Sequence, residues 1–309
     1  MTAAAEEGLL NPNTVVVFPE YIGLFLYLSD EFPWVYRAKT LQEAIARSLV
    51  DEKIWIAALG LKYPNGKRLK GIQAELMRLK ARTAAQHYHE VFSHLARQFR
   101  VTIVAGSIPL PDPVVEDGVL TTSPGAHPWR GMRNVSAVFH PDGRLDPQLV
   151  IKKEPTREEA DELWIKPQPD AAQPIFNTPA GRLGVLICAD SWHPQLYHGL
   201  DRPDLIAIPG AGFEGDKWSR PWGGPNAASG SEFPHDPSDV GSITEGYAWM
   251  RYTLPAYAGS VGARGAMTTF LQGRLWDMAP SGQPILWREG FARTFAPQDR
   301  GHTVSVVWL

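Results

Sequence analysis

The sequence of 309 residues contains a single cysteine, Cys188. One thiol excludes a disulfide within the chain, and it excludes a zinc or iron–sulfur site built from several thiolates. Long apolar runs are also missing. The most apolar stretch, residues 15–28, is interrupted by Pro19 and Glu20 and is shorter than the ~20 residues that span a bilayer. We therefore expect no transmembrane helix, and the lone cysteine is either buried filler or a nucleophile.

Runs of basic residues are absent as well. The chain has no five consecutive Lys or Arg and a net charge of −3, so no row of cations is available to neutralise phosphates. A nucleic-acid partner is therefore not expected. The first residues, MTAAAEEGLL, lack the basic start and the continuous apolar segment of a secretion signal. This pattern predicts a cytoplasmic location.

The composition is that of a globular protein, with 44% hydrophobic and 20% charged residues. Short apolar runs typical of strands alternate with stretches of helical periodicity, and no repeat or linker divides the chain. We predict one α/β domain covering residues 1–309. A Gly-, Pro- and Ser-rich stretch at residues 210–245 is predicted to be a long loop insertion, and loops of this length are usually functional or mobile.

The local patterns also predict individual elements. Helical spacing of apolar residues from 69 to 99 indicates one long helix or two in series. Residues 54–59 and the terminal VSVVWL, residues 304–309, are typical of strands. Residues 110–130 are rich in Pro, Gly, Asp and Thr, which predicts an exposed loop.

Three apolar strands are each predicted to end at a reactive side chain. VVVFPE leads to Glu20, LVIKKEP leads to a pair of lysines at 152 and 153, and GVLICAD leads to Cys188. Ligand sites of α/β sheets gather outside the carboxyl ends of strands, so the three segments can share one site. Taken singly, each residue also fits a plainer interpretation, because glutamates and lysines at strand ends are usually solvated and free cysteines are usually buried.

The residues after Cys188 are predicted to turn directly into a helix that begins at Asp190 or Ser191. The dipole at a helix N-terminus favours a thiolate over a thiol, which would make the cysteine nucleophilic near neutral pH. A buried core cysteine is the alternative that this segment alone leaves open.

Taken together, the three segments resemble the nitrilase (carbon-nitrogen hydrolase) superfamily. That family has a glutamate in a strand-ending FPE, a lysine in an (R/K)K motif, and a cysteine in IC-x-(D/E) with a proline four residues after the acid. This chain has FPE at 18–20, KK at 152–153, and ICAD followed by Pro194. Further matches occur in the family's order between about residues 14 and 285: Gly106-Ser107, Asn134, Ser136, Ala137, Pro141-Asp142-Gly143, DLIAIP at 204–209 and PSG at 280–282.

The resemblance implies an α-β-β-α sandwich, with two mixed sheets flanked by helices, that forms four layers when two copies pair. It implies a homodimer or higher homo-oligomer and neither a metal nor another cofactor. Family members usually begin with a strand and a long helix before the FPE strand. Only about a dozen residues precede that strand here, so we expect the first strand of the family to be missing.

The resemblance also assigns roles. Glu20 would be the general base, Cys188 the nucleophile and a lysine the cation that stabilises the oxyanion, together with the backbone N–H of Ala189. Independently of the resemblance, the position of Trp192 close to the nucleophile makes it a candidate for an aromatic substrate pocket, and ordinary packing is the alternative in a chain with 11 tryptophans. The expected reaction is cleavage of a non-peptide carbon–nitrogen bond in an amide, N-carbamoyl compound or nitrile through a cysteine thioester. A catalytically weak or inactive scaffold or binding protein with the same fold is the alternative.

Either lysine of the pair can take the catalytic place. Nitrilases in the narrow sense resemble RKL-x-PT-x-x-E, and Pro155-Thr156 then selects Lys152 and makes Glu159 the family's second, supporting glutamate. Reading Ile151-Lys152 as the family's Tyr-Arg would select Lys153 instead. Side chains alternate across a strand, so only one of the two can face the site. We prefer Lys152.

Overall fold

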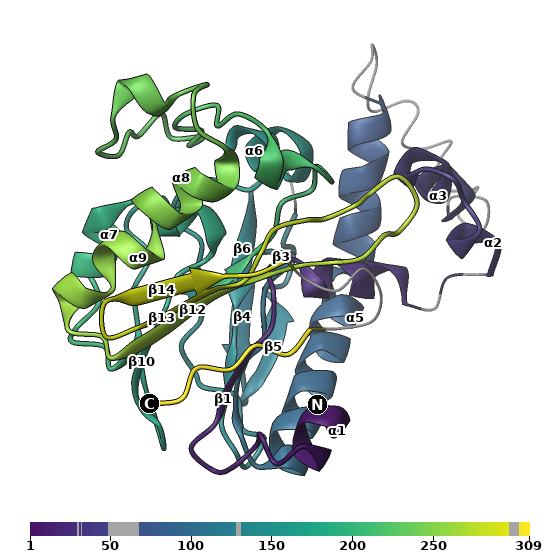
Figure 1. Ribbon diagram of the computed structural model, residues 1–309. Coiled ribbons are helices and arrows are strands. Elements are labelled where there is room, and N and C mark those ends of the chain that lie inside the picture. The colour runs from purple at the N-terminus through teal and green to yellow at the C-terminus, as the bar shows by residue number, and fades with distance from the viewer. Residues whose placement is uncertain (30, 32, 49–67, 128–130, 297–302) are drawn as a thin grey trace.

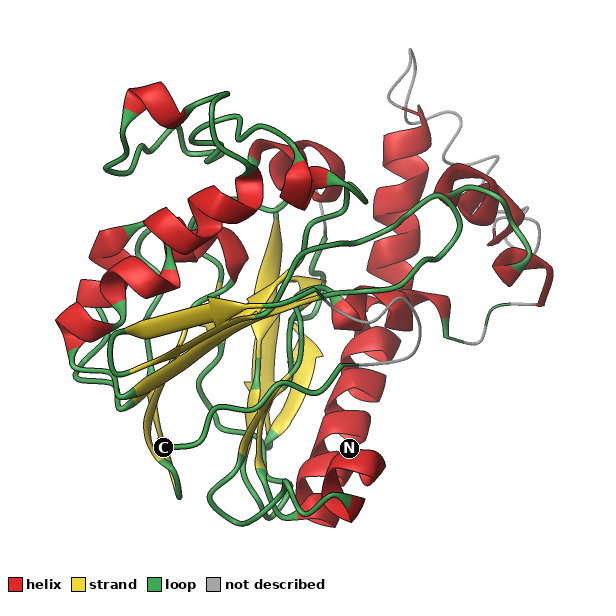
Figure 2. Ribbon diagram, viewed as in Figure 1, coloured by secondary structure: helices red, strands yellow, loops and turns green. Residues whose placement is uncertain are grey.

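The computed structural model describes residues 1–29, 31, 33–48, 68–127, 131–296 and 303–309. The strand predicted at residues 54–59 lies outside these ranges. Strands in the described part form two layers, and helices cover the outer face of each layer (Figures 1 and 2). A search of the described helices finds none that is both long and apolar enough to cross a membrane.

The first strand layer consists of two short sheets, and the chain passes directly from one to the other. Their orders are β1-β2-β7 and β3-β6-β8. The bounds are β1 Val15–Val17, β2 Thr102–Val104, β3 Ile108–Pro111, β6 Met132–Ser136, β7 Val138–Phe139 and β8 Val150–Ile151. A hydrogen bond from the Ala105 N–H to the Ala137 carbonyl, 3.0 Å long, joins the two sheets where β2 runs on toward β3.

The second layer is a six-stranded sheet in the order β14-β13-β12-β11-β10-β9. Its bounds are β9 Ile175–Thr178, β10 Gly181–Val185, β11 Leu205–Gly210, β12 Gly265–Phe270, β13 Ile285–Arg288 and β14 Phe291–Thr294. The central strands β10, β11 and β12 are parallel, and the flanking pairs are antiparallel. The carboxyl ends of the parallel strands therefore open at one edge, where polar loops can gather.

One long helix, α5 (Arg68–Phe99), covers the outer face of the first layer. Ala81, Ala84, Ala85, Tyr88 and Phe92 recur at helical spacing along its buried face. The predicted helical character of residues 69–99 is thus confirmed, and of the two alternatives, one helix or two in series, the structure has one.

On the other side, α7 (Pro194–His198), α8 (Glu245–Tyr252) and α9 (Leu254–Tyr257) cover the six-stranded sheet. The remaining helices of the described residues are α1 Thr2–Glu6, α2 Pro33–Tyr36, α3 Leu41–Ser48 and α6 Arg157–Leu163, with 3₁₀ helices at η1 Ile22–Leu28, η3 Cys188–Trp192, η4 Lys217–Ser219, η5 Pro237–Asp239 and η6 Gly259–Val261.

Strand alternation separates the interior into two cores. Val17 and Val104 pack with the six-stranded sheet and its helices, whereas their neighbours Val16 and Ile103 pack toward α5. The first strand layer lies between these two cores and is buried on both faces, which explains the continuous apolar sequence of its strands. The predicted fold class is confirmed: the protein is a mixed α/β structure with several sheets between flanking helices, and Figure 1 shows the layers from left to right.

Two element predictions are wrong. Within residues 110–130, predicted as a loop, β4 (Pro113–Glu116) and β5 (Val119–Thr122) form a hairpin. Its central residues Asp117 and Gly118 both have positive φ, 51° and 78°, and an Asp-Gly pair between two apolar runs favours such a two-residue turn.

The terminal strand predicted at 304–309 is irregular chain instead. Leu309 packs on Gly265 in β12, and β12 already pairs with β11 and β13, so its edges offer no free hydrogen bonds.

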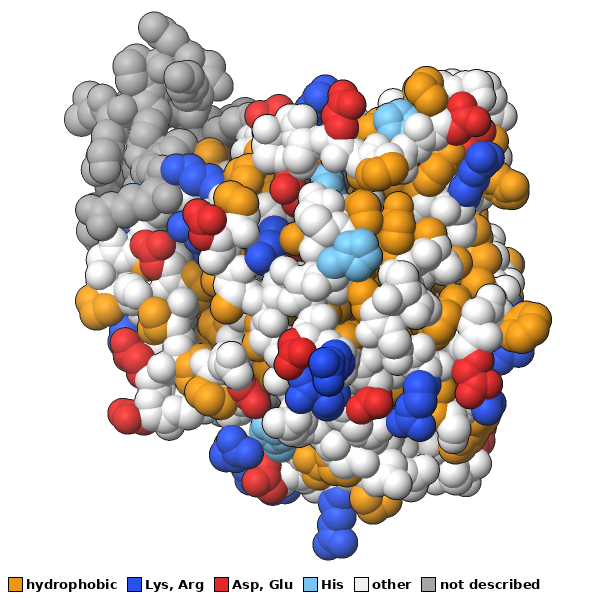
Figure 3. Space-filling model, turned by 90° about the vertical axis from the view of Figure 1, so that its left-hand side faces the viewer, with side chains coloured by type: hydrophobic (Ala, Val, Ile, Leu, Met, Phe, Trp, Pro, Cys, Tyr) orange, Lys and Arg blue, Asp and Glu red, His pale blue; other side chains and the backbone are white. Residues whose placement is uncertain are grey.

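On the face of the molecule turned toward the viewer in Figure 3, acidic and basic side chains are interspersed among hydrophobic ones. The described residues of this face form no large patch of one charge.

Candidate active site

Glu20 follows β1, where Pro19 ends the strand, and its carboxyl group is turned into the protein, with 1% of the residue exposed. Its backbone N–H donates to the carbonyl of Gly210 at the end of β11, at 3.3 Å, so the glutamate lies between the two strand layers. The next residue, Tyr21, has a positive φ of 61° and donates its N–H to the Ser107 hydroxyl at 2.9 Å. The strand end is thus held by specific contacts on both sides.

Gly106 holds this strand end through close backbone packing. It has a φ of +69°, and a methyl group there would collide with the Pro19 carbonyl oxygen and lie 2.8 Å from the Cγ2 atom of Ile22. Only glycine fits both the conformation and the space. The Gly-Ser pair at 106–107 therefore positions the residue that carries the carboxyl group.

We expect Gly106→Ala to destabilise the protein by about 1–3 kcal/mol more than Gly118→Ala. Both glycines have similar positive φ values, but Gly118 has nothing within 4 Å of the added methyl group. The difference in the free energy of unfolding, measured in urea, isolates the collision with Pro19 from the backbone strain common to both variants. Equal losses in the two variants would contradict the positioning role of Gly106.

Lys152 follows β8, and its ammonium group is enclosed by carboxylates. Nζ lies 2.8 Å from Oε1 of Glu20 and 2.7 Å from both carboxylate oxygens of Glu159, and 1% of the lysine is exposed. Lys153 points away from this group, and its Nζ donates to the Pro169 carbonyl at 3.2 Å. The structure therefore brings Glu20, Lys152 and Glu159 together and leaves Lys153 outside.

The PT-x-x-E pattern has a structural explanation. Thr156 is the N-cap of α6, and its backbone N–H donates to Oε2 of Glu159 at 2.7 Å, while the Glu159 N–H donates to the threonine hydroxyl at 3.3 Å. This capping box fixes the Glu159 carboxylate with one oxygen toward the helix start. The same carboxylate accepts from Lys152 and from the Tyr21 hydroxyl. Glu159 thus completes the cap of α6 and also binds the buried ammonium group of Lys152.

The surroundings of Glu20 and Lys152 shift the pKa values of both groups. Burial raises the pKa of Glu20 to about 7 against the opposing effect of Lys152, and Glu159 raises it further. Burial lowers the pKa of Lys152, but the adjacent Glu159 and Glu20 outweigh this and raise it well above its ordinary value. The lysine therefore stays charged, and Glu20 exchanges its proton near neutral pH. Asn134 supports Glu20 by donating from Nδ2 to Oε1 at 2.9 Å.

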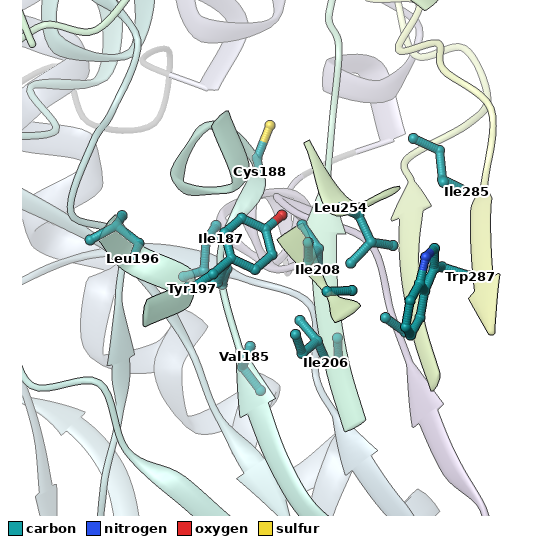
Figure 4. Packing of buried hydrophobic residues seen from close by; sticks show 14 of the residues in the cluster. Val185, Ile187, Cys188, Leu196, Tyr197, Ile206, Ile208, Leu254, Ile285 and Trp287 are labelled. Atoms are coloured by element: carbon teal, nitrogen blue, oxygen red, sulfur yellow. The ribbon is translucent and has the colours of Figure 1, made fainter. Parts of the chain in front are cut away.

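Cys188 lies beyond β10, at the start of η3, with a φ of 46° that is rare for a residue with a side chain. Such strained residues cluster at functional sites. In Figure 4 its sulfur points away from the buried cluster formed by Val185, Ile206 and Ile208. The thiol contacts the Ala211 carbonyl at 3.6 Å, and 6% of the residue is exposed.

The expectation of a helix dipole acting on this thiol is wrong. The segment after Cys188 is a five-residue 3₁₀ helix that begins at the cysteine itself, so the long helix dipole expected from this segment is not formed. Burial, followed by the nearby Glu20 carboxyl, raises the pKa of the Cys188 thiol well above its ordinary value, although Lys152 opposes this. The resting cysteine is therefore a thiol, and reaction requires a base.

Asp190, predicted only as a helix start, connects two loops of the site. Its Oδ1 accepts the backbone N–H groups of Lys153 at 3.0 Å and Glu154 at 2.8 Å, and its Oδ2 accepts that of Ile187 at 3.2 Å. Burial raises its pKa to about 6 despite these bonds. The acid of the ICAD motif thus joins the cysteine segment to the lysine segment.

A pocket of about 350 Å³ opens at Cys188. Ala189 and Trp192, both predicted at the site, line it. Most of its other walls come from the 210–245 segment and α8, including Trp218, Trp222, Phe233 and Trp249.

The 210–245 segment is tied to the lysine segment by backbone hydrogen bonds. The Ala228 N–H donates to the Pro155 carbonyl at 2.8 Å, and the Arg157 N–H donates to the Asn226 carbonyl at 3.1 Å. These bonds lie a few residues from Lys152. The 210–245 segment is therefore a wall of the site.

Comparison with solved structures identifies the fold. A carbon-nitrogen hydrolase from Helicobacter pylori G27 matches with a TM-score of 0.51 and 14% sequence identity, over 94% of this chain and 73% of that one. The chain has the nitrilase fold. This confirms the fold expected from the motif resemblance.

Two other solved structures with the nitrilase fold match less closely. One is the amidase from Nesterenkonia sp. AN1 in complex with butyramide, at a TM-score of 0.47 and 12% identity over 70% of this chain; the match spans 65% of the amidase, less than two thirds of its length. The other is a nitrilase superfamily member of Saccharomyces cerevisiae, at 0.44 and 18% over 66% of this chain and 58% of that one. No family model matches the sequence, and no curated protein matches it.

Proposed function

We propose that the protein hydrolyses a carbon–nitrogen bond by nucleophilic catalysis at Cys188. The observation that carries this proposal is the buried group of Glu20, Lys152 and Glu159 beside the chain's only thiol, at a pocket large enough for a small molecule. Burying three charged side chains costs free energy that a purely structural role does not require. Perturbed carboxyl and thiol groups at a pocket are the usual signature of a reactive site.

The proposed reaction begins when Glu20 takes the proton of the Cys188 thiol and the sulfur bonds to the substrate carbon. Negative charge then develops on the substrate heteroatom, and the Lys152 ammonium and the Ala189 N–H stabilise it; losing one such donor typically costs ~10²–10³ in rate. The carbon–nitrogen bond of an amide breaks, and the leaving amine takes the proton from Glu20. Water, losing a proton to Glu20, then cleaves the thioester and restores the thiol.

The Glu20 carboxyl suits both directions of proton transfer. Its pKa, raised by burial to about 7, lets it accept a proton from the thiol and return it to the amine at neutral pH. Glu159 holds Lys152 by two short contacts and is itself fixed by the cap of α6. We therefore assign Glu159 the role of positioning the ammonium.

We expect kcat/KM for an amide to rise with pH, about tenfold per unit, until about pH 7 and then to level off. The sign follows from the chemistry, because Glu20 must lose its proton before it can accept the one from the thiol. The Glu20→Gln variant should lack this titration and lose roughly 10²–10⁴ in rate. A wild-type profile that is flat from about pH 5 to about pH 8 would exclude Glu20 as the base.

The substrate group can be assigned by measuring ammonia release from a panel of aliphatic and aromatic amides, N-carbamoyl compounds and nitriles. The sequence gives opposing indications, because Asp190 is typical of amidases and carbamoylases, whereas the PT-x-x-E register is typical of nitrilases. The proposal predicts turnover with at least one of these groups. Absence of turnover with all of them would argue against hydrolysis.

An inactive scaffold or binding protein with the same fold is a second candidate. The observation that favours it is the burial of Cys188 together with the raised pKa of its thiol. Alkylation by iodoacetamide near neutral pH separates the two candidates. Rapid reaction that an amide suppresses supports the enzyme, and an inert thiol supports the scaffold.

A further inference from the structure

We infer that the substrate carries an aromatic group, of phenyl or indolyl size, next to the carbon–nitrogen bond that is cleaved. The inference rests on the hydrolase proposed above and names the class of substrate for the same site. It follows from the walls of the pocket at Cys188, where tryptophan and phenylalanine side chains contact one another.

The first wall is built around Trp192, four residues after the nucleophile. Its ring stacks on Trp222 with centroids 5.7 Å apart and planes at 6°, and it meets Phe233 at 5.3 Å and Trp249 edge-to-face at 5.0 Å. All four residues line the pocket and are at most 7% exposed. A flat aromatic ligand gains offset-stacked or edge-to-face contacts against such rings, beyond the gain from apolar burial.

The second wall continues from Trp249 through Phe270 to Trp218, with successive ring centroids 5.0 Å and 5.3 Å apart. Trp218 rests directly on the backbone of α8 at Gly246, where any side chain would collide with the indole. The aromatic lining is therefore continuous from one side of the pocket to the other. Its rings come from four separate segments: η3, the 210–245 segment, α8 and β12.

Two carboxylates line the pocket, and both have partners of their own. Glu245 is hydrogen-bonded by Trp249 and lies in the field of Lys217, and Glu158 accepts from the Asn226 amide at 2.7 Å. Among the described lining residues, these contacts satisfy the two carboxylates without a cation from the ligand. The aromatic surface is therefore the feature of the lining that the substrate matches, and an aromatic ring without a positive charge fits it.

The size of the pocket supports a ring over a short aliphatic chain. A volume of about 350 Å³ lies in the range of ~300–1,000 Å³ that is typical of sites for larger organic ligands. Acetamide would leave most of the aromatic surface without a partner, and surface that stays hydrated contributes nothing to transition-state binding.

The test compares kcat/KM for phenylacetamide and acetamide, which present the same reacting group. We expect the wild-type ratio to be on the order of 10² or more in favour of phenylacetamide. Trp222→Leu should lower this ratio at least about tenfold, and Gly246→Ala, which displaces Trp218 without removing a ring, should lower it in the same direction. Trp308→Leu, a half-exposed tryptophan outside the pocket, is the matched control and should leave both rates unchanged.

A second measurement separates this inference from the proposed hydrolysis. Calorimetric titration of the Cys188→Ala protein with both amides measures binding without turnover. Tighter binding of phenylacetamide that Trp222→Leu abolishes upholds the aromatic preference, even if the wild-type protein hydrolyses nothing. Hydrolysis of both amides with a ratio near one, or equal affinities in the titration, would overturn the inference while leaving the hydrolase proposal intact.

Discussion

Replacing Cys188 by alanine is expected to reduce carbon–nitrogen bond hydrolysis to the background rate, a loss of the order of 10⁶-fold. The alanine cannot form the bond to the substrate carbon, and no second thiol exists in the chain to replace it. The fold should survive, because the lost sulfur points away from the hydrophobic cluster beneath it. Ammonia release and thermal unfolding, measured on the same preparation, check both halves of the expectation.

The Lys152→Ala variant provides a comparison that separates loss of activity from loss of stability. Cys188→Ala and Lys152→Ala should both lose activity, but only the lysine variant should also lose stability, because only there are buried charges left uncompensated. Retained hydrolysis in pure Cys188→Ala protein would refute the nucleophile assignment. An unfolded Cys188→Ala protein would instead indicate that the thiol is a packing residue.

Lys152→Ala is expected to destabilise the protein by about 3–5 kcal/mol above neutral pH. The substitution removes the ammonium that lies 2.8 Å from Glu20 and 2.7 Å from Glu159, and it leaves two buried carboxylates facing each other. Lys153→Ala is the matched control. Its ammonium contacts only the Pro169 carbonyl among the described hydrogen bonds, so we expect a change within about 0.5 kcal/mol.

The pH dependence of the Lys152→Ala loss provides an internal check. Burial already raises the pKa of Glu20 to about 7 in the wild type, above its ordinary value of 4.5, and losing the lysine raises it further. An acid whose pKa is raised by folding binds its proton more tightly in the folded state, so stability falls as pH rises from the unfolded pKa to the folded one. Urea unfolding should therefore show a smaller deficit at about pH 5 than at about pH 8. A deficit equal to that of Lys153→Ala would contradict the placement of Lys152.

The parts of the site that can be predicted from the sequence are those that local sequence patterns determine. Glu20 follows an uninterrupted apolar strand that a proline stops. The preference for Lys152 over Lys153 needs the resemblance to nitrilases, whose register the Pro155-Thr156 pair fixes. Alternation along the strand then places one lysine inside and the next outside, as the structure has them. Helical spacing of apolar residues likewise predicts α5, and short apolar runs predict strands in both layers.

The other parts depend on contacts between distant segments. The raised pKa of the Cys188 thiol follows from burial and from Glu20, 168 positions earlier in the chain, whereas the neighbouring sequence suggested the opposite shift. Asn134 beside Glu20, Tyr21 on Glu159 and the loop-joining bonds of Asp190 are contacts of the same kind. The Asp-Gly turn of the β4–β5 hairpin differs, because its signal was present in the sequence and was outweighed by the Pro and Gly content around it.

The most direct test is intact-mass spectrometry of the protein quenched in acid during turnover of an amide identified by ammonia release. The account predicts a mass increase equal to the acyl group of that amide, mapped to the peptide containing Cys188, and no such increase in the Cys188→Ala protein. Turnover accompanied by acylation at another residue, or an adduct that persists in the alanine variant, would contradict it.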